Sequence, residues 1–196
     1  MKKKTFMLLA SLYASSAYSY DVMTGNYVEG AVGKANFENF CLPFNASACD
    51  ESTTSFRLAA GISLAKAISF DVGYIDFGEV STNGVGYQLT GAVTAYSAQI
   101  GLQTEAAKTL LFAKLGGAYT QFKQTSHITC ICINNANLAS NTHSDFGPMM
   151  TFGIELPIFE KLSVVGQYDY LISTKDNATS LNTNLGVFSI GIRGRL

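Results

Sequence analysis

The chain contains no tryptophan, only 3 prolines and few charged side chains. Charged residues make up 14% of its 196 residues, whereas a soluble domain usually carries about 25%. This shortage indicates that much of the folded surface does not face water. The formal net charge is -1, so the chain has no basic excess to attract nucleic acid, and we expect no nucleic-acid partner.

Long apolar runs are also missing, since no stretch approaches the ~20 residues that a membrane-spanning helix requires. The N-terminus instead has the parts of a secretory signal: lysines at positions 2–4, an apolar stretch over 6–14, and small side chains at Ala17 and Ser19. We therefore predict a cleaved signal peptide over residues 1–19 and one domain over residues 20–196. Cleavage after Ala17 and an uncleaved anchor are the alternatives.

The rest of the chain alternates between apolar and polar side chains with a period of two, which is typical of β-strands. Residues 56–64 show it best, with large apolar side chains or Ala at even positions and Arg57, Ala59, Gly61 and Ser63 between them. The same pattern predicts eight strands, several near the ~9–11 residues that a tilted membrane strand needs. They lie near residues 27–36, 54–64, 68–77, 90–103, 109–122, 146–156, 162–171 and 185–196.

The predicted connections alternate in length. Short ones lie near residues 65–67, 105–108 and 157–161, and long ones near 37–53, 78–89, 123–145 and 172–184. Such an arrangement places every long loop at one end, as in outer-membrane barrels with short periplasmic turns and longer external loops. The predicted fold class is therefore all-β: an eight-stranded antiparallel up-and-down transmembrane β-barrel.

The face opposite the large apolar side chains carries Gly, Ala and Ser together with single charges. An eight-stranded barrel has an interior just wide enough for side chains to fill, and buried charges must pair. We predict a polar-filled interior with a balanced charge network; the alternative is a soluble barrel with these residues outside. The network comprises Glu29, Asp71, Glu155 and Asp169 against Arg57, Lys114, Arg193 and Arg195.

Aromatic residues near the strand ends are candidates for the girdles that flank the lipid-facing band of such barrels. They could equally be ordinary strand formers. The candidates are Tyr27, Tyr74, Phe77, Tyr119, Phe122, Tyr168 and Tyr170.

Five stretches, at residues 27–31, 70–78, 112–119, 153–156 and 189–196, resemble the OmpA-like and opacity-like surface-antigen family of small outer-membrane barrels. The resemblance implies an eight-stranded barrel in the bacterial outer membrane, with both termini in the periplasm and the loops outside the cell. It also implies an interior salt-bridge network, which maps onto Arg57, Lys114, Glu155 and Arg193. Family members usually end in Phe, whereas this chain ends in Leu196.

The cysteines Cys41, Cys49, Cys130 and Cys132 all fall in predicted external loops. An exported protein passes an oxidising compartment, so disulfides are the first interpretation. Cys41–Cys49 with Cys130–Cys132 is the simplest pairing, but a bridge across one residue is strained, so pairing between the two loops remains open. A metal site that combines cysteines with His127 and His143 is the alternative, although the ligand spacing is unusual. We expect no cofactor.

The sequence His143-Ser144-Asp145 places a base, a hydroxyl and a carboxylate side by side. Adjacent strand residues point to opposite faces, so this contiguity argues against a catalytic triad, and we expect no enzyme. We instead expect a surface protein whose barrel anchors four external loops for structural, adhesion or host-interaction roles. A barrel hydrolase acting on lipid or peptide, and a very narrow pore, are the alternatives. The expected partners are outer-membrane lipid, lipopolysaccharide and a host or cell-surface ligand, with the protein itself a monomer.

Overall fold

A computed structural model describes residues 25–38, 48–49, 51–65, 67–84, 87–128, 139–172 and 184–196, and the predicted signal peptide lies outside these ranges. Within them, no helix combines the length and the apolar character needed to cross a bilayer. The elements are β1 (Gly25–Phe37), β2 (Ala48–Cys49), β3 (Ser52–Ala65), β4 (Ile68–Gly84), β5 (Tyr87–Ala106), β6 (Thr109–Ile128), β7 (Ala139–Phe159), β8 (Leu162–Leu171) and β9 (Leu185–Arg195).

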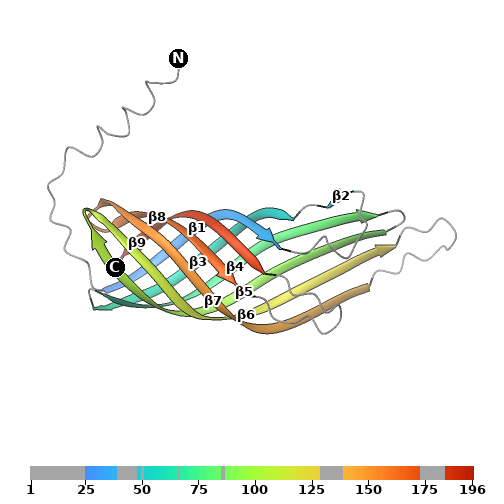
Figure 1. Ribbon diagram of the computed structural model, residues 1–196, viewed down its shortest axis with the longest axis horizontal. Helices are drawn as coiled ribbons and strands as arrows, with labels where there is room; N and C mark the ends of the chain where they lie inside the picture. Colours follow the sequence, from blue (N-terminus) through green and yellow to red (C-terminus); the bar gives the residue numbers. More distant parts are fainter. Residues whose placement is uncertain are drawn as a thin grey trace, which may run out of the picture.

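The eight long strands form one closed antiparallel barrel (Figure 1). Each long strand pairs with the next long strand in the sequence, and β9 pairs with β1 to close the barrel. The short β2 pairs only with two residues near the end of β4. Closure gives every long strand a partner on both sides, which hydrocarbon surroundings demand because they cannot satisfy free backbone groups. The predicted eight-stranded antiparallel barrel is thus confirmed.

The strands are strongly tilted, and their register shows by how much. A row followed across the paired strands from Tyr27 returns to β1 at Phe37, ten residues further along. On eight strands this stagger corresponds to a tilt of about 40° and a rise of about 2.5 Å per residue along the barrel axis. Residues that pair directly therefore lie at different heights, and side chains far apart in register share one level of the interior.

Four neighbouring strands, β4 to β7, run further than the sequence pattern predicts and project beyond the others (Figure 1). The predicted long connection at residues 78–89 is wrong, because β4 and β5 continue as a hairpin to Gly84 and Tyr87. The connection predicted at residues 123–145 shrinks to residues 129–138. These segments have polar side chains on their outward face because they lie past the apolar band, and apolar alternation therefore stops before the strands do.

The outward face of the barrel is apolar. Leu115 is 63% exposed and Ile190 55% exposed, and similar side chains cover the strands on all sides. Soluble monomers rarely expose apolar patches larger than a few hundred Å². The inner and outer faces of the barrel are therefore arranged as in a membrane barrel, with apolar side chains toward lipid.

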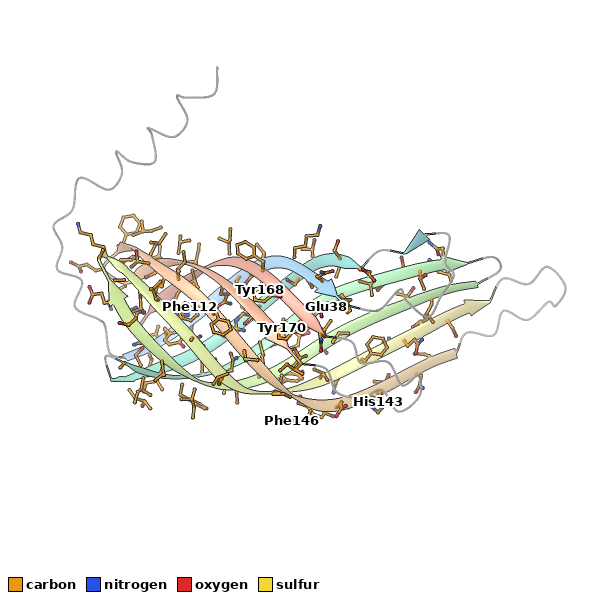
Figure 2. The ribbon with its side chains drawn as sticks, viewed as in Figure 1. Glu38, Phe112, His143, Phe146, Tyr168 and Tyr170 are labelled. Atoms are coloured by element: carbon orange, nitrogen blue, oxygen red, sulfur yellow. The ribbon has the colours of Figure 1, made fainter. Side chains whose placement is uncertain are left out.

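One row of aromatic side chains crosses four strands toward the loop end of this band. Tyr74, Tyr96, Tyr119 and Phe146 are successive direct partners on β4 to β7, and the rings of Tyr74 and Tyr96 lie 5.4 Å apart. Tyr168 and Tyr170 stack on the outside of β8, as Figure 2 shows. These positions suit an interfacial girdle.

Three of the aromatic residues predicted for a girdle belong to the interior instead. Tyr27 and Phe77 are buried inside the barrel, and Phe122 packs against the buried apolar cluster there. The prediction used nearness to a strand end, which says nothing about the face. Strand residues two apart point to the same face, and each of these three aromatic residues lies two residues from a side chain that points inward, as Tyr27 does from Glu29.

Candidate functional site

The eight predicted network residues all lie in the barrel interior, and the most accessible of them, Arg195, is only 8% exposed. They come from seven of the eight long strands. Four carboxylates face four cations, so the set carries no net charge. Such neutrality is required because an uncompensated charge in this setting is very costly.

Arg193 lies at the centre of one half of this network, the half that is nearer the short turns. Its Nη2 lies 2.6 Å from Glu29 Oε2 and its Nη1 2.6 Å from Glu155 Oε2. Arg193 Nε also donates to Glu29 Oε2 at 3.1 Å. Arg195 Nη2 reaches the other oxygen of Glu155 at 2.5 Å. One guanidinium therefore joins two carboxylates that come from β1 and β7.

Arg57 extends the network toward the loop end. Its Nε lies 3.3 Å from Glu29 Oε1, and its Nη1 lies 3.0 Å from Asp169 Oδ1. A longer contact of 3.9 Å joins Arg57 Nη2 to Asp71 Oδ1, and Asp71 is also paired with Lys114. Because Glu29 is shared by Arg57 and Arg193, all eight charges form one connected cluster.

Two aromatic rings pack against the cations. The Arg193 Cζ lies 4.4 Å from the centroid of the Tyr27 ring and 5.1 Å from that of Phe112. Lys114 Nζ lies 4.9 Å from the Phe112 centroid, and the Tyr27 hydroxyl donates to Asp71 Oδ2 at 3.0 Å. These contacts fall within the ~6 Å range of cation–π attraction. Neither ring was predicted to lie in the network, although each is two residues from a predicted network charge.

Glycines make room for these two rings. A Cβ added to Gly61 would collide with the Tyr27 ring, and one added to Gly153 would collide with the Phe112 ring. Each ring therefore lies over a glycine of a neighbouring strand, which gives the interior a large side chain without widening the barrel.

Uncharged polar side chains add hydrogen bonds to two of the carboxylates, Glu29 and Asp169. Gln167 Nε2 donates to Glu29 Oε1 at 2.9 Å. Gln99 Nε2 donates to Thr151 Oγ1 at 2.9 Å, and Thr151 Oγ1 donates to Asp169 Oδ1 at 2.6 Å. None of these three residues was predicted as a member of the network, because an inward Gln or Thr has no charge that would single it out.

Above the charged cluster, toward the loop end, the interior is mainly apolar. On β1 the inward side chains change from Glu29 to Ala35 and Phe37, and on β4 they change from Asp71 to Ile75 and Phe77. The prediction of a polar-filled interior is therefore wrong for the loop-end half. This apolar plug consists of Ala35, Phe37, Ile75, Phe77, Val80, Val93, Ala95, Ala118, Met149, Leu171, Leu185 and Val187, with Phe122 packed against it.

The predicted disulfides lie outside the described residues. Cys41, Cys130 and Cys132 fall beyond the described ranges, and Cys49 is described only as backbone of β2. His127 is likewise described only as backbone, at the end of β6. Across the ranges given above, no group of three or more His, Cys, Asp or Glu side chains is arranged to hold a metal ion.

The stretch 143–145 lies on β7, where the three side chains alternate between the two faces. His143 and Asp145 share the inward phase and are half-buried, whereas Ser144 points to the other face and is exposed. The backbone thus separates the hydroxyl from the base and the carboxylate, as the sequence reasoning expected for contiguous strand residues.

Comparison with known proteins places the chain among outer-membrane barrels. Residues 5–193 match the family described as "Outer membrane protein beta-barrel domain". No curated protein matches the chain in sequence.

Solved structures share the fold at low identity. The attachment invasion locus protein Ail of Yersinia pestis is 12% identical, with a TM-score of 0.57 over 89% of this chain and 100% of Ail. Neisserial surface protein A is 16% identical, with a TM-score of 0.57 over 88% of this chain and 98% of its own. OprG from Pseudomonas aeruginosa is 11% identical, with a TM-score of 0.51 over 88% and 96%.

Proposed function

The chain belongs to the outer membrane protein beta-barrel domain family, and on that premise we propose that its barrel is a closed, non-conducting anchor that presents its loop end outside the cell. The observation that carries this proposal is the filled interior. Eight paired charges occupy the half nearer the turns, and an apolar plug occupies the half nearer the loops. The chain is assigned no catalytic step.

The outward face suits a membrane anchor because it is apolar and because its apolar band has a suitable extent along the barrel axis. On β6 the exposed large apolar side chains run from Leu111 to Tyr119. At about 2.5 Å of axial rise per residue this distance is about 20 Å, close to the ~25 Å height of the apolar band in outer-membrane barrels. The charged cluster lies at the level of this band, where water is scarce and mutual pairing matters most.

The charged cluster and the apolar plug together argue against a pore. Aqueous channels belong to barrels of ~16–18 strands, whereas eight strands leave a space that side chains fill. The plug residues Phe37, Phe77 and Met149 are at most 1% exposed, and they separate the ion pairs from the loop end. In planar bilayers we expect no conductance steps from the purified protein. Regular steps that persist after the loops are replaced would reject the closed anchor.

The proposed orientation puts the loop end outside the cell and both termini in the periplasm. Three connections at the turn end are short, near residues 66–67, 107–108 and 160–161, while β4 to β7 project past the aromatic row at the opposite end. An epitope inserted at residues 85–86 should be accessible to antibody on intact cells. One inserted at residues 107–108 should become accessible only after the outer membrane is permeabilised, and the reverse result would invert the orientation.

The loop end is also the proposed place of contact with lipopolysaccharide or with a cell-surface ligand. The support is its location, because the turn end has short connections and little surface of its own. Bacteria that carry the protein should bind host-cell monolayers better than bacteria that carry the same barrel with residues 39–47, 129–138 and 173–183 shortened. Equal binding, with both barrels assembled equally, would leave the protein a purely structural role.

A further inference from the structure

Lys114 and Asp71 are the lysine–carboxylate pair of the interior network. Lys114 Nζ lies in direct contact with Asp71 Oδ2, and the two residues are only 2% and 1% exposed. The other three cations of the network are arginines, whose guanidinium groups do not give up a proton in proteins. A lysine can give up a proton, and its neutral amine is a nucleophile. This pair therefore has a chemistry that the rest of the network lacks.

Glycines on the neighbouring strands bring this pair together. Lys114 is on β6 and Asp71 on β4, so the lysine side chain has to cross the intervening β5. It crosses at Gly101, where an added Cβ would lie 2.9 Å from Lys114 Cγ. A Cβ added to Gly61 of β3 would lie 2.8 Å from Asp71 Cβ and would also collide with the Tyr27 ring. Both glycines thus keep the space around the contact open.

The surroundings of the pair disfavour the charge on Lys114. Lys114 Nζ lies 5.8 Å and Arg193 Cζ 4.4 Å from the centroid of the Tyr27 ring. The same two cations lie 4.9 Å and 5.1 Å from the centroid of Phe112, which is labelled in Figure 2. Two cations on the same pair of rings repel each other. Transfer of one proton from Lys114 to Asp71 relieves this repulsion and leaves an amine beside a carboxylic acid, two uncharged groups that a dry interior tolerates better.

Two further groups contact the oxygens of Asp71 in a way that suits amide formation. The Tyr27 hydroxyl donates to Oδ2 at 3.0 Å, and Oδ2 is also the oxygen in contact with Lys114. Arg57 Nη2 lies 3.9 Å from Oδ1, and within the described ranges neither of these two atoms has a hydrogen-bond partner. A proton donor therefore faces one oxygen, and a cation faces the other, where it can stabilise a developing negative charge.

We propose that Lys114 and Asp71 condense into an internal amide bond once the barrel has closed. The Lys114 ammonium first gives one proton to Asp71 Oδ2. The Nζ lone pair then attacks Asp71 Cγ, the Cγ–Oδ2 bond breaks, and Oδ2 leaves as water. Its second proton comes from the Tyr27 hydroxyl, which takes the proton that Nζ releases and so ends unchanged. The reaction joins Nζ to Cγ, releases one water and needs no other reactant.

The closed barrel supplies the conditions for this reaction. Groups held in contact react as if one were present at a concentration on the order of 10⁵ M or more. The interior excludes water, which would otherwise hydrolyse the product. It holds four charges of each sign before the reaction and three after it, so the charge balance is kept. The bond links β4 to β6, and the inference depends on the described interior alone, not on the proposed anchor role or its orientation.

The test compares the mass of the full chain before and after folding. The chain is kept unfolded in urea, refolded into lipid vesicles until it shows the folded gel mobility, and then denatured for mass spectrometry, with reductant in both samples. Because the bond needs the closed barrel, the mass should fall by one water only after refolding. Digestion should then yield two peptides linked through residues 71 and 114. An unchanged mass of the folded protein, or a lost water without that linked pair, overturns the proposal.

A double variant provides the matched control. Lys114→Met with Asp71→Asn removes one charge of each sign, as the reaction does, but cannot form the bond. After boiling, the unmodified chain should migrate faster in a denaturing gel than the double variant, because residues 71–114 remain closed in a loop. Equal mobility of the two boiled chains contradicts the bond.

A second variant tests the role of the hydroxyl. Tyr27→Phe keeps the ring over Gly61 and should slow the loss of water on the order of 100-fold, a usual effect of removing an acid–base group. An unchanged rate rejects the part assigned to Tyr27. The mass change of the unmodified chain needs no variant, so a misfolded variant leaves the main test intact.

Discussion

Replacing Arg193 with methionine should destabilise the barrel more than any single change on its outer surface. The guanidinium is buried and joins Glu29 and Glu155 at 2.6 Å each, and its face lies 4.4 Å from the Tyr27 ring. Methionine has similar length and no charge, so the substitution removes the cation while largely filling its place. It leaves four carboxylates facing three cations inside a low-dielectric space.

The expected loss in the free energy of unfolding is about 3–5 kcal/mol, the usual cost of removing one partner from a buried pair. The lost cation–π contact contributes on the order of 1 kcal/mol within that figure. A second change that restores the charge balance of the interior should recover part of the lost stability. Arg193→Met combined with Glu155→Gln leaves three charges of each sign, and we expect it to be more stable than Arg193→Met alone by about 1–2 kcal/mol, since the remaining uncompensated charge is removed.

The assay is reversible urea unfolding of the protein in lipid vesicles, followed by the shift in gel mobility between folded and unfolded barrel. Lys34→Met, an exposed outer-face change, serves as the control and should alter stability by less than about 0.5 kcal/mol. If Arg193→Met unfolds at the same urea concentration as the unmodified protein, the ion network does not stabilise the barrel. If the double variant is less stable than the single one, charge balance is not the reason for the loss.

Three further outcomes follow from the same geometry. Gly61→Ala should lower the free energy of unfolding by about 1–3 kcal/mol because its Cβ meets the Tyr27 ring. Gly166→Ala, whose Cβ comes no closer than 3.7 Å to another side chain, should leave that free energy nearly unchanged, and equal effects of the two changes would contradict the ring packing. Phe77→Ala, in the plug, should cost about 3–5 kcal/mol in the same titration, and a loss below 1 kcal/mol would mean the plug is loosely packed. His143→Ala should leave the lipid A composition of the cells unchanged by mass spectrometry, and an altered pattern would point to a hydrolase.

The sequence was a good guide to which face each strand residue occupies, and a poor guide to where a strand ends. Alternation is a local property, so the inward phase of Arg57 and Glu155 could be read from their neighbours. Where the strands leave the apolar band, as at residues 78–89, polar side chains occupy the outward face and the signal that marked the strand disappears. β4 also has a bulge between Asp76 and Glu79, where Gly78 adopts a φ of +81° and its N–H donates to Asp76 Oδ1 at 2.9 Å. This break looks like a turn in the sequence, yet the strand continues.

The amino-acid sequence by itself therefore determined an inside-out, eight-stranded β-barrel with a balanced set of inward charges, because hydrophobic alternation and charge counts need no knowledge of distant partners. Only the tertiary structure decided which of those charges meet. Glu29 and Arg193 are 164 residues apart, and the ten-residue stagger on closing the barrel sets the level at which they face each other. The same closure turned Tyr27 from a girdle candidate into a partner of Asp71 and Arg193, and gathered the inward apolar residues into a plug. Contacts across a closed cylinder depend on all its strands together, and no local pattern encodes them.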